Sequence, residues 1–251
     1  MMATTTDQLA DLLQRLNAGE DPESVREQAR RLLASLDPAD LALAEQKLAE
    51  AGLAPEDLRG LCSIHLEVLG DQLDAMRADL APGHVVHTLV AEHDMILDFL
   101  RALERVNAEM QQLEAYDPAR EEFGLLHHLA EHLVGAEKHH QREEDVLFPE
   151  VEARGVYGPP QIMRLEHDTL RPLKHELVEL AEQVAELEFA EFRRRVNAAA
   201  TVLVPTLTEH IWKENNILYP TALKIIPDAS AWARMKAECD AIGYCCFTPE
   251  V

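Results

Sequence analysis

Basic residues are scarce in this sequence of 251 residues, which has 23 Lys and Arg against 46 Asp and Glu and a formal net charge of −23. Nucleic-acid binding draws most of its affinity from Lys and Arg clustered at phosphates, so we expect no nucleic-acid partner. An anionic membrane surface is disfavoured for the same reason, and no uninterrupted apolar run approaches the ~20 residues that span a bilayer. No early stretch has the basic flank and apolar core of a secretion signal. We therefore expect a cytoplasmic protein without a membrane partner.

Cysteine is also rare, with four residues at Cys62, Cys239, Cys245 and Cys246. Four cysteines do not make a disulfide framework in a chain of this length, so we expect reduced thiols. The last three lie close together near the end of the sequence. Either they pack without further chemistry, or an exposed thiolate among them accepts electrons, metal or a disulfide partner.

One stretch of the sequence is nearly written twice, at residues 139–149 and 210–220. Both copies have the pattern His-x3-Glu-x3-Leu-aromatic-Pro. On a helix, His and Glu four positions apart are separated by ~6 Å of rise and ~40° of rotation, so both side chains reach the same point beside the axis. Each copy therefore predicts a pair of residues that chelates a metal.

The second copy decides a register that the first leaves open, because His139 could pair with Glu143 or His140 with Glu144. When the copies are aligned on the final Pro, His140 falls opposite Ile211. We therefore predict His139 with Glu143 in the first copy and His210 with Glu214 in the second.

A second repeat, Glu-His-Asp, precedes each copy at residues 92–94 and 166–168, inside apolar sequence of helical period. A duplicated helical hairpin closes naturally into a four-helix bundle, and the core of such a bundle is where facing helices assemble metal sites. We expect an all-α fold in which six side chains converge: His93, His139, Glu143, His167, His210 and Glu214.

Proline and glycine divide the chain into three parts, at residues 1–80, 84–222 and 223–251. The first part predicts a module of short helices near 5–17, 23–35, 38–51 and 55–79. The second predicts bundle helices near 86–114, 119–152, 160–187 and 190–219, with Pro205 either kinking the last helix or marking its true start. The third predicts a short helix around 229–241 and an irregular tail that contains Cys245 and Cys246.

The six side chains contain too many nitrogen and oxygen atoms for a closed tetrahedral zinc site and too much nitrogen for calcium or magnesium. Shared between two ions, they give each ion two His, and both Glu can bridge. First-row metals with such ligands are most often iron, and manganese or mixed iron and manganese is the main competitor. We expect His87 and His175 not to bind metal because of their helical positions. His132 could instead contact a side chain that binds the metal, without binding the metal itself.

At these motifs, over about residues 84–222, the sequence resembles the hemerythrin-like family and its HHE cation-binding branch. The resemblance implies a non-haem di-iron centre, with an oxo or hydroxo bridge, in an up-down-up-down bundle. In that centre His93, His139, His167 and His210 bind iron, and Glu143 and Glu214 bridge the two ions. Residues 1–80 resemble a small module of unassigned function that often precedes such domains. Oxygen carriers of the family have a further His four residues after the position of His167, where this chain has Arg171.

These features predict a non-haem di-iron protein that senses or responds to O2, NO or redox state and relays the change through the N-terminal module or the tail. The small-molecule partners would be O2, NO or peroxide, and a protein partner could bind the N-terminal module. Two alternatives remain open: an enzyme that handles NO or peroxide or repairs damaged iron centres, and an iron storage or trafficking module. Residues 139–149 resemble proteins implicated in the repair of damaged iron centres.

Overall fold

The computed structural model describes residues 80–249 together with residues 8, 11, 15 and 28 of the preceding segment. The predicted N-terminal module and Cys62 therefore lie outside the described residues. The described part from residue 80 onward is helical and contains no strand. None of its helices is both long and apolar enough to cross a bilayer.

The helices follow one another with short connections, and their bounds are α6 Val85–Met110, α7 Glu121–Gly135, α8 Glu137–Arg142, the π-helix η1 Glu143–Leu147, α9 Phe148–Glu152, α10 Gly158–Gln183, α11 Phe189–Lys213, the π-helix η2 Glu214–Leu218, α12 Tyr219–Ile225 and α13 Ala229–Ile242. They fall into two compact units. One unit consists of Pro82–Glu143, Arg164–Ile211 and Met235–Val251, and the other includes Glu144–Met163 and Trp212–Arg234.

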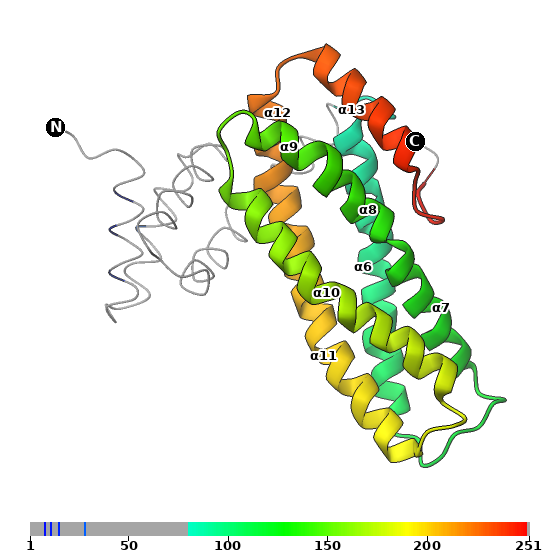
Figure 1. The fold of residues 1–251 in the computed structure, drawn as a ribbon. Helices are drawn as coiled ribbons and strands as arrows, with labels where there is room; N and C mark the ends of the chain where they lie inside the picture. The colour runs from blue at the N-terminus through cyan, green and yellow to red at the C-terminus, as the bar shows by residue number, and fades with distance from the viewer. Residues whose placement is uncertain (1–7, 9–10, 12–14, 16–27, 29–79, 250–251) are drawn as a thin grey trace. The chain divides into compact units, whose positions relative to one another are not determined.

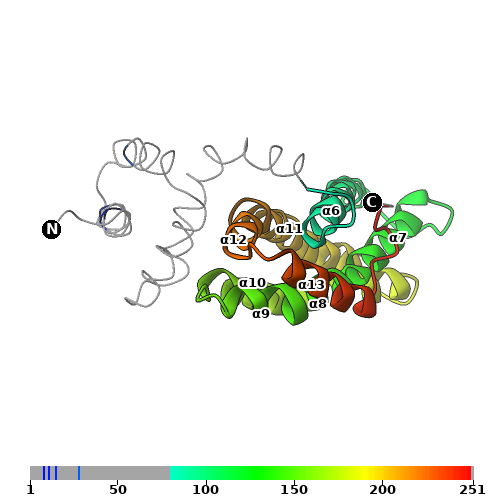
Figure 2. The same ribbon diagram turned by 90° about the horizontal axis from the view of Figure 1, so that it is seen from above.

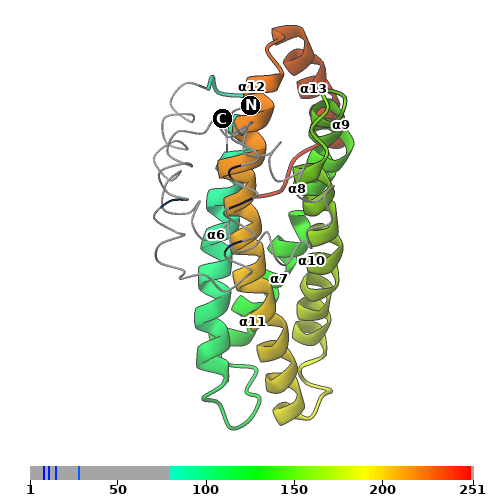
Figure 3. The same ribbon diagram turned by 90° about the vertical axis from the view of Figure 1, so that its left-hand side faces the viewer.

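The first unit is a four-helix bundle in which α6 and α10 run one way and α7 and α11 run the other (Figures 1 and 3). Seen from above, these helices group around one another rather than forming a single layer (Figure 2). This is the expected up-down-up-down arrangement. Its helices also begin close to the predicted positions, at residues 85, 121, 158 and 189.

The bundle is held together by apolar side chains that recur with the period of a helix. In α6 these are Ile96, Leu100, Leu103, Val106 and Met110, each at most 2% exposed. Spacings of three and four residues place them on one face, which packs with leucines and aromatics of α7, α10 and α11. Burying such faces is the main stabilising term of a helical bundle.

The second predicted bundle helix, 119–152, is divided in the structure. Its first segment, α7, ends at Gly135, and the chain continues as α8, η1 and α9. Gly135 has low helix propensity, and Pro149 has no N–H and a ring that clashes with the carbonyl four residues back, at residue 145 inside η1. Widening the helix to a π-turn there relieves the clash.

The fourth predicted helix, 190–219, changes in the same way, since α11 passes into η2 and then into α12 with Pro220 in its first turn. Pro205 lies inside α11 and does not mark its start. Both copies of the repeated stretch therefore carry a π-turn that begins at the glutamate and ends just before the aromatic-Pro pair. The repeat in sequence is a repeat in backbone geometry.

The second unit includes the segment that follows Glu143 and the segment Trp212–Arg234, which contains Glu214. Within it, α12 packs against η2. Trp232 donates its indole N–H to the carbonyl of Ile226 at 2.8 Å, and Arg234 forms an ion pair with Glu150. Gly155 has a φ of +88°, a conformation that favours glycine, in the turn between α9 and α10.

Candidate metal centre

Four histidines from four helical segments are buried in the bundle. His93 lies on α6, His139 on α8, His167 on α10 and His210 on α11, and none is more than 1% exposed. Each occupies the inward position that the helical period of its own segment predicts. The structure therefore brings together all four histidines expected from the sequence.

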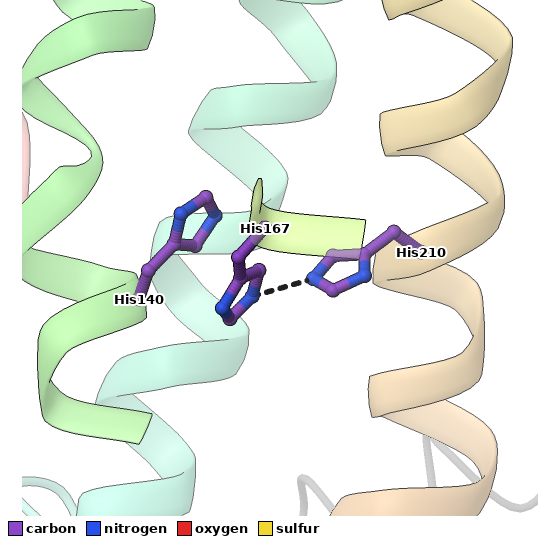
Figure 4. Close-up of side chains that lie close together, drawn as sticks. All are labelled: His140, His167 and His210. Carbon is purple, nitrogen blue, oxygen red and sulfur yellow. Dashed lines mark hydrogen bonds between the residues drawn. The ribbon is translucent and has the colours of Figure 1, made fainter. Parts of the chain in front are cut away.

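The four rings form two pairs whose Nε2 atoms face each other. The two Nε2 atoms are 3.0 Å apart in His93 and His139 and 2.9 Å apart in His167 and His210, a pair visible in Figure 4. Two nitrogens that bind one ion at about 2.1 Å from neighbouring corners of an octahedron are about 3.0 Å apart, against about 3.4 Å in a tetrahedron. The observed spacing fits an octahedral ion at each pair.

A glutamate lies behind one histidine of each pair. The Nδ1 of His139 is 2.7 Å from Glu92 Oε2, and the Nδ1 of His210 is 2.8 Å from Glu166 Oε2. An ionised carboxylate can only accept, so each ring donates its Nδ1–H and keeps a lone pair on Nε2. This is the arrangement in which carboxylates orient histidines that bind metals and make them more basic.

Glu92 is held as an ionised carboxylate at the centre of several donors. Burial alone raises its pKa, but the hydrogen bond from His139, the charge of Arg142 and the hydrogen bond from Thr248 outweigh burial and lower the pKa to about 2. Arg142, which is 1% exposed, donates to Glu92 at 2.7 and 2.5 Å.

The roles of Glu92 and Glu166 were not predicted from the sequence, although both belong to the repeated Glu-His-Asp elements. The glutamate that precedes the histidine in both copies of the motif was the sequence signal that could have identified them. The Asp residues of the same elements, Asp94 and Asp168, are exposed. The motif therefore contains one inward histidine, one supporting glutamate for a histidine of another helix, and a surface aspartate.

Glu143 lies between the two histidine pairs. Its Oε2 atom is 3.6 Å from His139 Nε2 and 3.6 Å from His167 Nε2, and its side chain is fully buried. A carboxylate that faces one histidine from each pair is placed to bridge two ions. Glu143 thus lies beside His139, the residue with which the sequence pairs it, and binding of a metal by this pair stays a prediction.

Glu214 has the same local setting in the second copy. It is 1% exposed, begins η2 four residues after His210, and so matches Glu143, which begins η1 four residues after His139. Its part as the second bridging carboxylate stays a prediction.

His140 also belongs to this cluster, although alignment of the two copies had set it aside. Its ring stacks on His167 with centroids 3.8 Å apart, and ring nitrogens of His140, His167 and His210 lie within 4.8 Å of one another (Figure 4). Burial, together with the charge of Lys174, holds the pKa of His140 well below its ordinary value, so the ring is neutral. The second copy could not reveal this residue because it has Ile211 there.

A network of charged side chains lies next to His140. His140 Nδ1 is 3.5 Å from Lys174 Nζ and 3.5 Å from a carboxylate oxygen of Glu137. Arg171 donates to Glu137 at 2.6 Å and to Asp168 at 3.0 Å. Lys174 is 1% exposed, and its burial lowers its pKa to about 8. Arg171 therefore engages carboxylates at the position where an oxygen carrier has a histidine.

The remaining histidines of α6, α7 and α10 have other surroundings. His175 is exposed, as expected for a residue outside the centre. His132 donates from Nδ1 to the carbonyl of His128 at 3.0 Å and packs on Phe99 with ring centroids 4.9 Å apart. These contacts link His132 to the apolar surface of α6.

The cysteines near the end of the chain are mostly enclosed. Cys239 and Cys245 are buried, and burial raises their pKa values to about 11 and about 12. Both are therefore protonated at neutral pH, which favours the interpretation that they pack. Cys246 is exposed.

Imidazole and carboxylate groups in this arrangement suit six-coordinate first-row metal ions, so the residues fit the non-haem iron that the sequence predicts. The fit rests on the facing Nε2 atoms, on the carboxylates behind His139 and His210, and on the bridging position of Glu143. None of these features requires a charged histidine.

Comparison with known proteins agrees with this chemistry. The model of a family described as hemerythrin HHE cation binding domain matches residues 84–222, and that of a family of unknown function (DUF438) matches residues 9–75.

Two relatives are each named iron-sulfur cluster repair protein YtfE. The one from Yersinia pseudotuberculosis serotype IB (strain PB1/+) is 32% identical over 106 residues, which cover 40% of this chain and 48% of the relative. The one from Salmonella schwarzengrund (strain CVM19633) is 27% identical over 141 residues, which cover 55% of this chain and 64% of the relative. The chain thus spans less than two thirds of either relative's length.

Proposed function

Because the chain belongs to the hemerythrin HHE cation binding family, we propose that it holds two non-haem iron ions and supplies iron for the repair of damaged iron-sulfur clusters. The observation that carries the iron site is the pair of facing histidine couples with Glu143 between them. The names of the relatives support repair as the purpose.

In this proposal His93 and His139 bind one ion, His167 and His210 bind the other, and Glu143 and Glu214 bridge them. Glu92 and Glu166 keep the protons of His139 and His210 on Nδ1, so both Nε2 lone pairs face the metal positions. Bound iron supplies open coordination positions and a one-electron change of charge. The alternative is that the site binds manganese, or one iron and one manganese.

Reversible oxygen carriage is not part of the proposal. The guanidinium of Arg171 has no lone pair to offer, and it is engaged by Glu137 and Asp168. Without a fifth histidine, the ligands on the two ions are equal in number. We propose that small molecules such as NO, O2 or peroxide reach either ion.

The names of the relatives favour repair over a role as a sensor. A sensor would need a relay from the bundle through the N-terminal module or the tail. Iron delivery needs only a site that binds iron and gives it up. Storage without delivery is distinguished from repair by the experiment that follows.

The test has two stages. Metal analysis of the purified chain should give two iron atoms per chain, and one tightly held zinc would contradict the site. The iron-loaded chain is then mixed anaerobically with a hydro-lyase whose [4Fe-4S] cluster has lost one iron by oxidation to [3Fe-4S], in the presence of dithiothreitol as the one-electron reductant and a chelator that captures free Fe²⁺. We expect hydro-lyase activity to return together with loss of iron from the chain.

The control is the same amount of Fe²⁺ added with chelator and without the chain. A second control is an Asp94→Asn variant, which changes only an exposed carboxylate. If the loaded chain restores no more activity than Fe²⁺ with chelator does, the repair proposal is wrong and the storage interpretation stands.

A further inference from the structure

The segment that follows α13 turns back toward the bundle (Figure 1). Gly243 has a φ of +87° and donates its N–H to the carbonyl of Cys239 at 2.9 Å, which ends the helix and reverses the chain. A side chain at residue 243 would also meet the ammonium of Lys138, 3.4 Å from its Cβ. Residues 243–248, hereafter the C-terminal segment, are therefore directed toward α8.

The C-terminal segment contacts Arg142, the residue next to Glu143. The Arg142 guanidinium lies over the ring of Tyr244, 4.8 Å from its centroid, and one of its nitrogens is 3.9 Å from Cys245 Sγ. Phe247 packs edge to face on Phe99 of α6 with centroids 5.1 Å apart. The segment is thus attached to both α6 and α8.

Thr248 reaches the polar group behind the first histidine pair. Its hydroxyl donates to Glu92 Oε1 at 2.5 Å, and its own N–H donates to the carbonyl of Cys245 at 3.0 Å. Glu92 Oε2 accepts the Nδ1–H of His139, and Arg142 donates to both oxygens of Glu92. Thr248 is thereby connected to His139 Nε2 through one carboxylate and one imidazole ring.

The two histidine pairs differ in the surroundings of their supporting glutamates. The Glu92 side chain is 0% exposed under its donors, whereas that of Glu166 is 18% exposed. A carboxylate enclosed by fixed donors holds its histidine in one orientation, whereas a carboxylate that reaches water has more freedom. Carboxylates of this kind typically change metal affinity about tenfold to hundredfold when they are altered.

We propose that Thr248 is a positioning residue through which the C-terminal segment fixes His139, so that the ion at His93 and His139 is held more firmly than the ion at His167 and His210. This inference rests on the proposed di-iron centre. It divides the centre into a retained ion and a releasable ion. A releasable ion beside a retained one suits a protein that donates iron.

The test measures release of iron from the loaded, di-ferrous chain to a colorimetric Fe²⁺ chelator in the wild type and in Thr248→Val. Valine keeps the shape of threonine but has no hydroxyl, so it removes only the donor to Glu92. We expect the more slowly released ion to leave about tenfold faster in Thr248→Val, and the faster ion to leave at its wild-type rate.

Two further variants separate positioning from packing. Thr248→Ser keeps the hydroxyl and should release both ions at the wild-type rates. Thr201→Val removes a threonine hydroxyl that bonds only within α11, to the carbonyls of Asn197 and Ala198, and should also behave as the wild type. Circular dichroism checks that each variant has the same helix content.

The possible failures are distinct. If the wild type does not hold two iron atoms, the proposed di-iron centre is wrong. If it holds two and Thr248→Val releases both at the wild-type rates, the centre stands and the positioning role of Thr248 is wrong. Equal acceleration of both ions, or acceleration in Thr248→Ser, would also overturn that role.

Discussion

Glu92 and Glu166 decide which ring nitrogen of His139 and His210 carries the proton. Each lies next to a histidine in sequence, yet each supports a histidine that is more than forty residues away, on a different helix. The period of a single helix predicts which side chains share a face, and so it predicts His93 and His167. It does not predict a hydrogen bond across the bundle, which is why these glutamates were missed.

A first prediction follows from these hydrogen bonds. Glu92→Gln and Glu166→Gln should each weaken binding of one ion about tenfold to hundredfold, because a neutral amide orients the imidazole less strongly. The measurement is iron affinity by competition with a chelator of known strength. Asp94→Asn is the matched control, because this aspartate belongs to the same motif and is exposed. Equal losses in the glutamate and aspartate variants would contradict the assignment of roles within the repeated motif.

A second prediction concerns the neighbouring histidines of α8. His139 has its Nδ1–H held by Glu92 and its Nε2 lone pair directed at His93, whereas His140 lies outside both pairs of facing Nε2 atoms. His139→Ala should therefore lose an ion, and His140→Ala should keep both. Iron content of the two purified variants measures this. Equal loss would show that His140 binds metal as firmly as His139.

At the scale of the element, the helices were predictable and their interruptions were not. Apolar period and proline placed the starts of α6, α10 and α11 within two residues, at 85, 158 and 189 against the expected 86, 160 and 190. The π-turns at Glu143 and Glu214 escaped prediction, because the sequence shows the proline but not whether the chain kinks, ends or widens there. Each turn begins at a predicted bridging carboxylate, and widened turns are frequent at functional sites.

A third prediction compares two glycines that differ in backbone conformation. Gly155 has a φ of +88°, so Gly155→Ala should destabilise the chain by about 1–2 kcal/mol. Gly124 lies inside α7 with open space at its Cβ position, so Gly124→Ala should stabilise it by about 0.5–1 kcal/mol. Thermal unfolding should show melting temperatures shifted in opposite directions, by about 2–4 °C per kcal/mol. Shifts of the same sign would show that backbone conformation does not decide these substitutions.

At the scale of the whole molecule, duplication was the strongest signal in the sequence. Two copies of each motif required two equivalent halves, and the structure contains two histidine pairs with a glutamate behind each. Duplication also limits what can be predicted, because comparison of the two copies cannot identify a feature that occurs in only one of them. His140, Arg171 and the C-terminal segment are of this kind, and they are the residues that make the halves differ.

The formal charge of −23 gives the last prediction. A strongly anionic molecule concentrates cations around itself and can raise the rate at which they bind by tenfold or more at low salt. The screening length falls from about 30 Å at 0.01 M salt to about 8 Å at 0.15 M, so most of this attraction disappears over that range. Uptake of Fe²⁺ by the metal-free chain, followed by stopped-flow absorption, should slow about tenfold between these two salt concentrations. NO is uncharged, and its rate of binding to the loaded chain should not change, which controls for an effect of salt on the bundle itself. An Fe²⁺ uptake rate that is independent of salt would mean that the negative charge of this chain has no part in collecting iron.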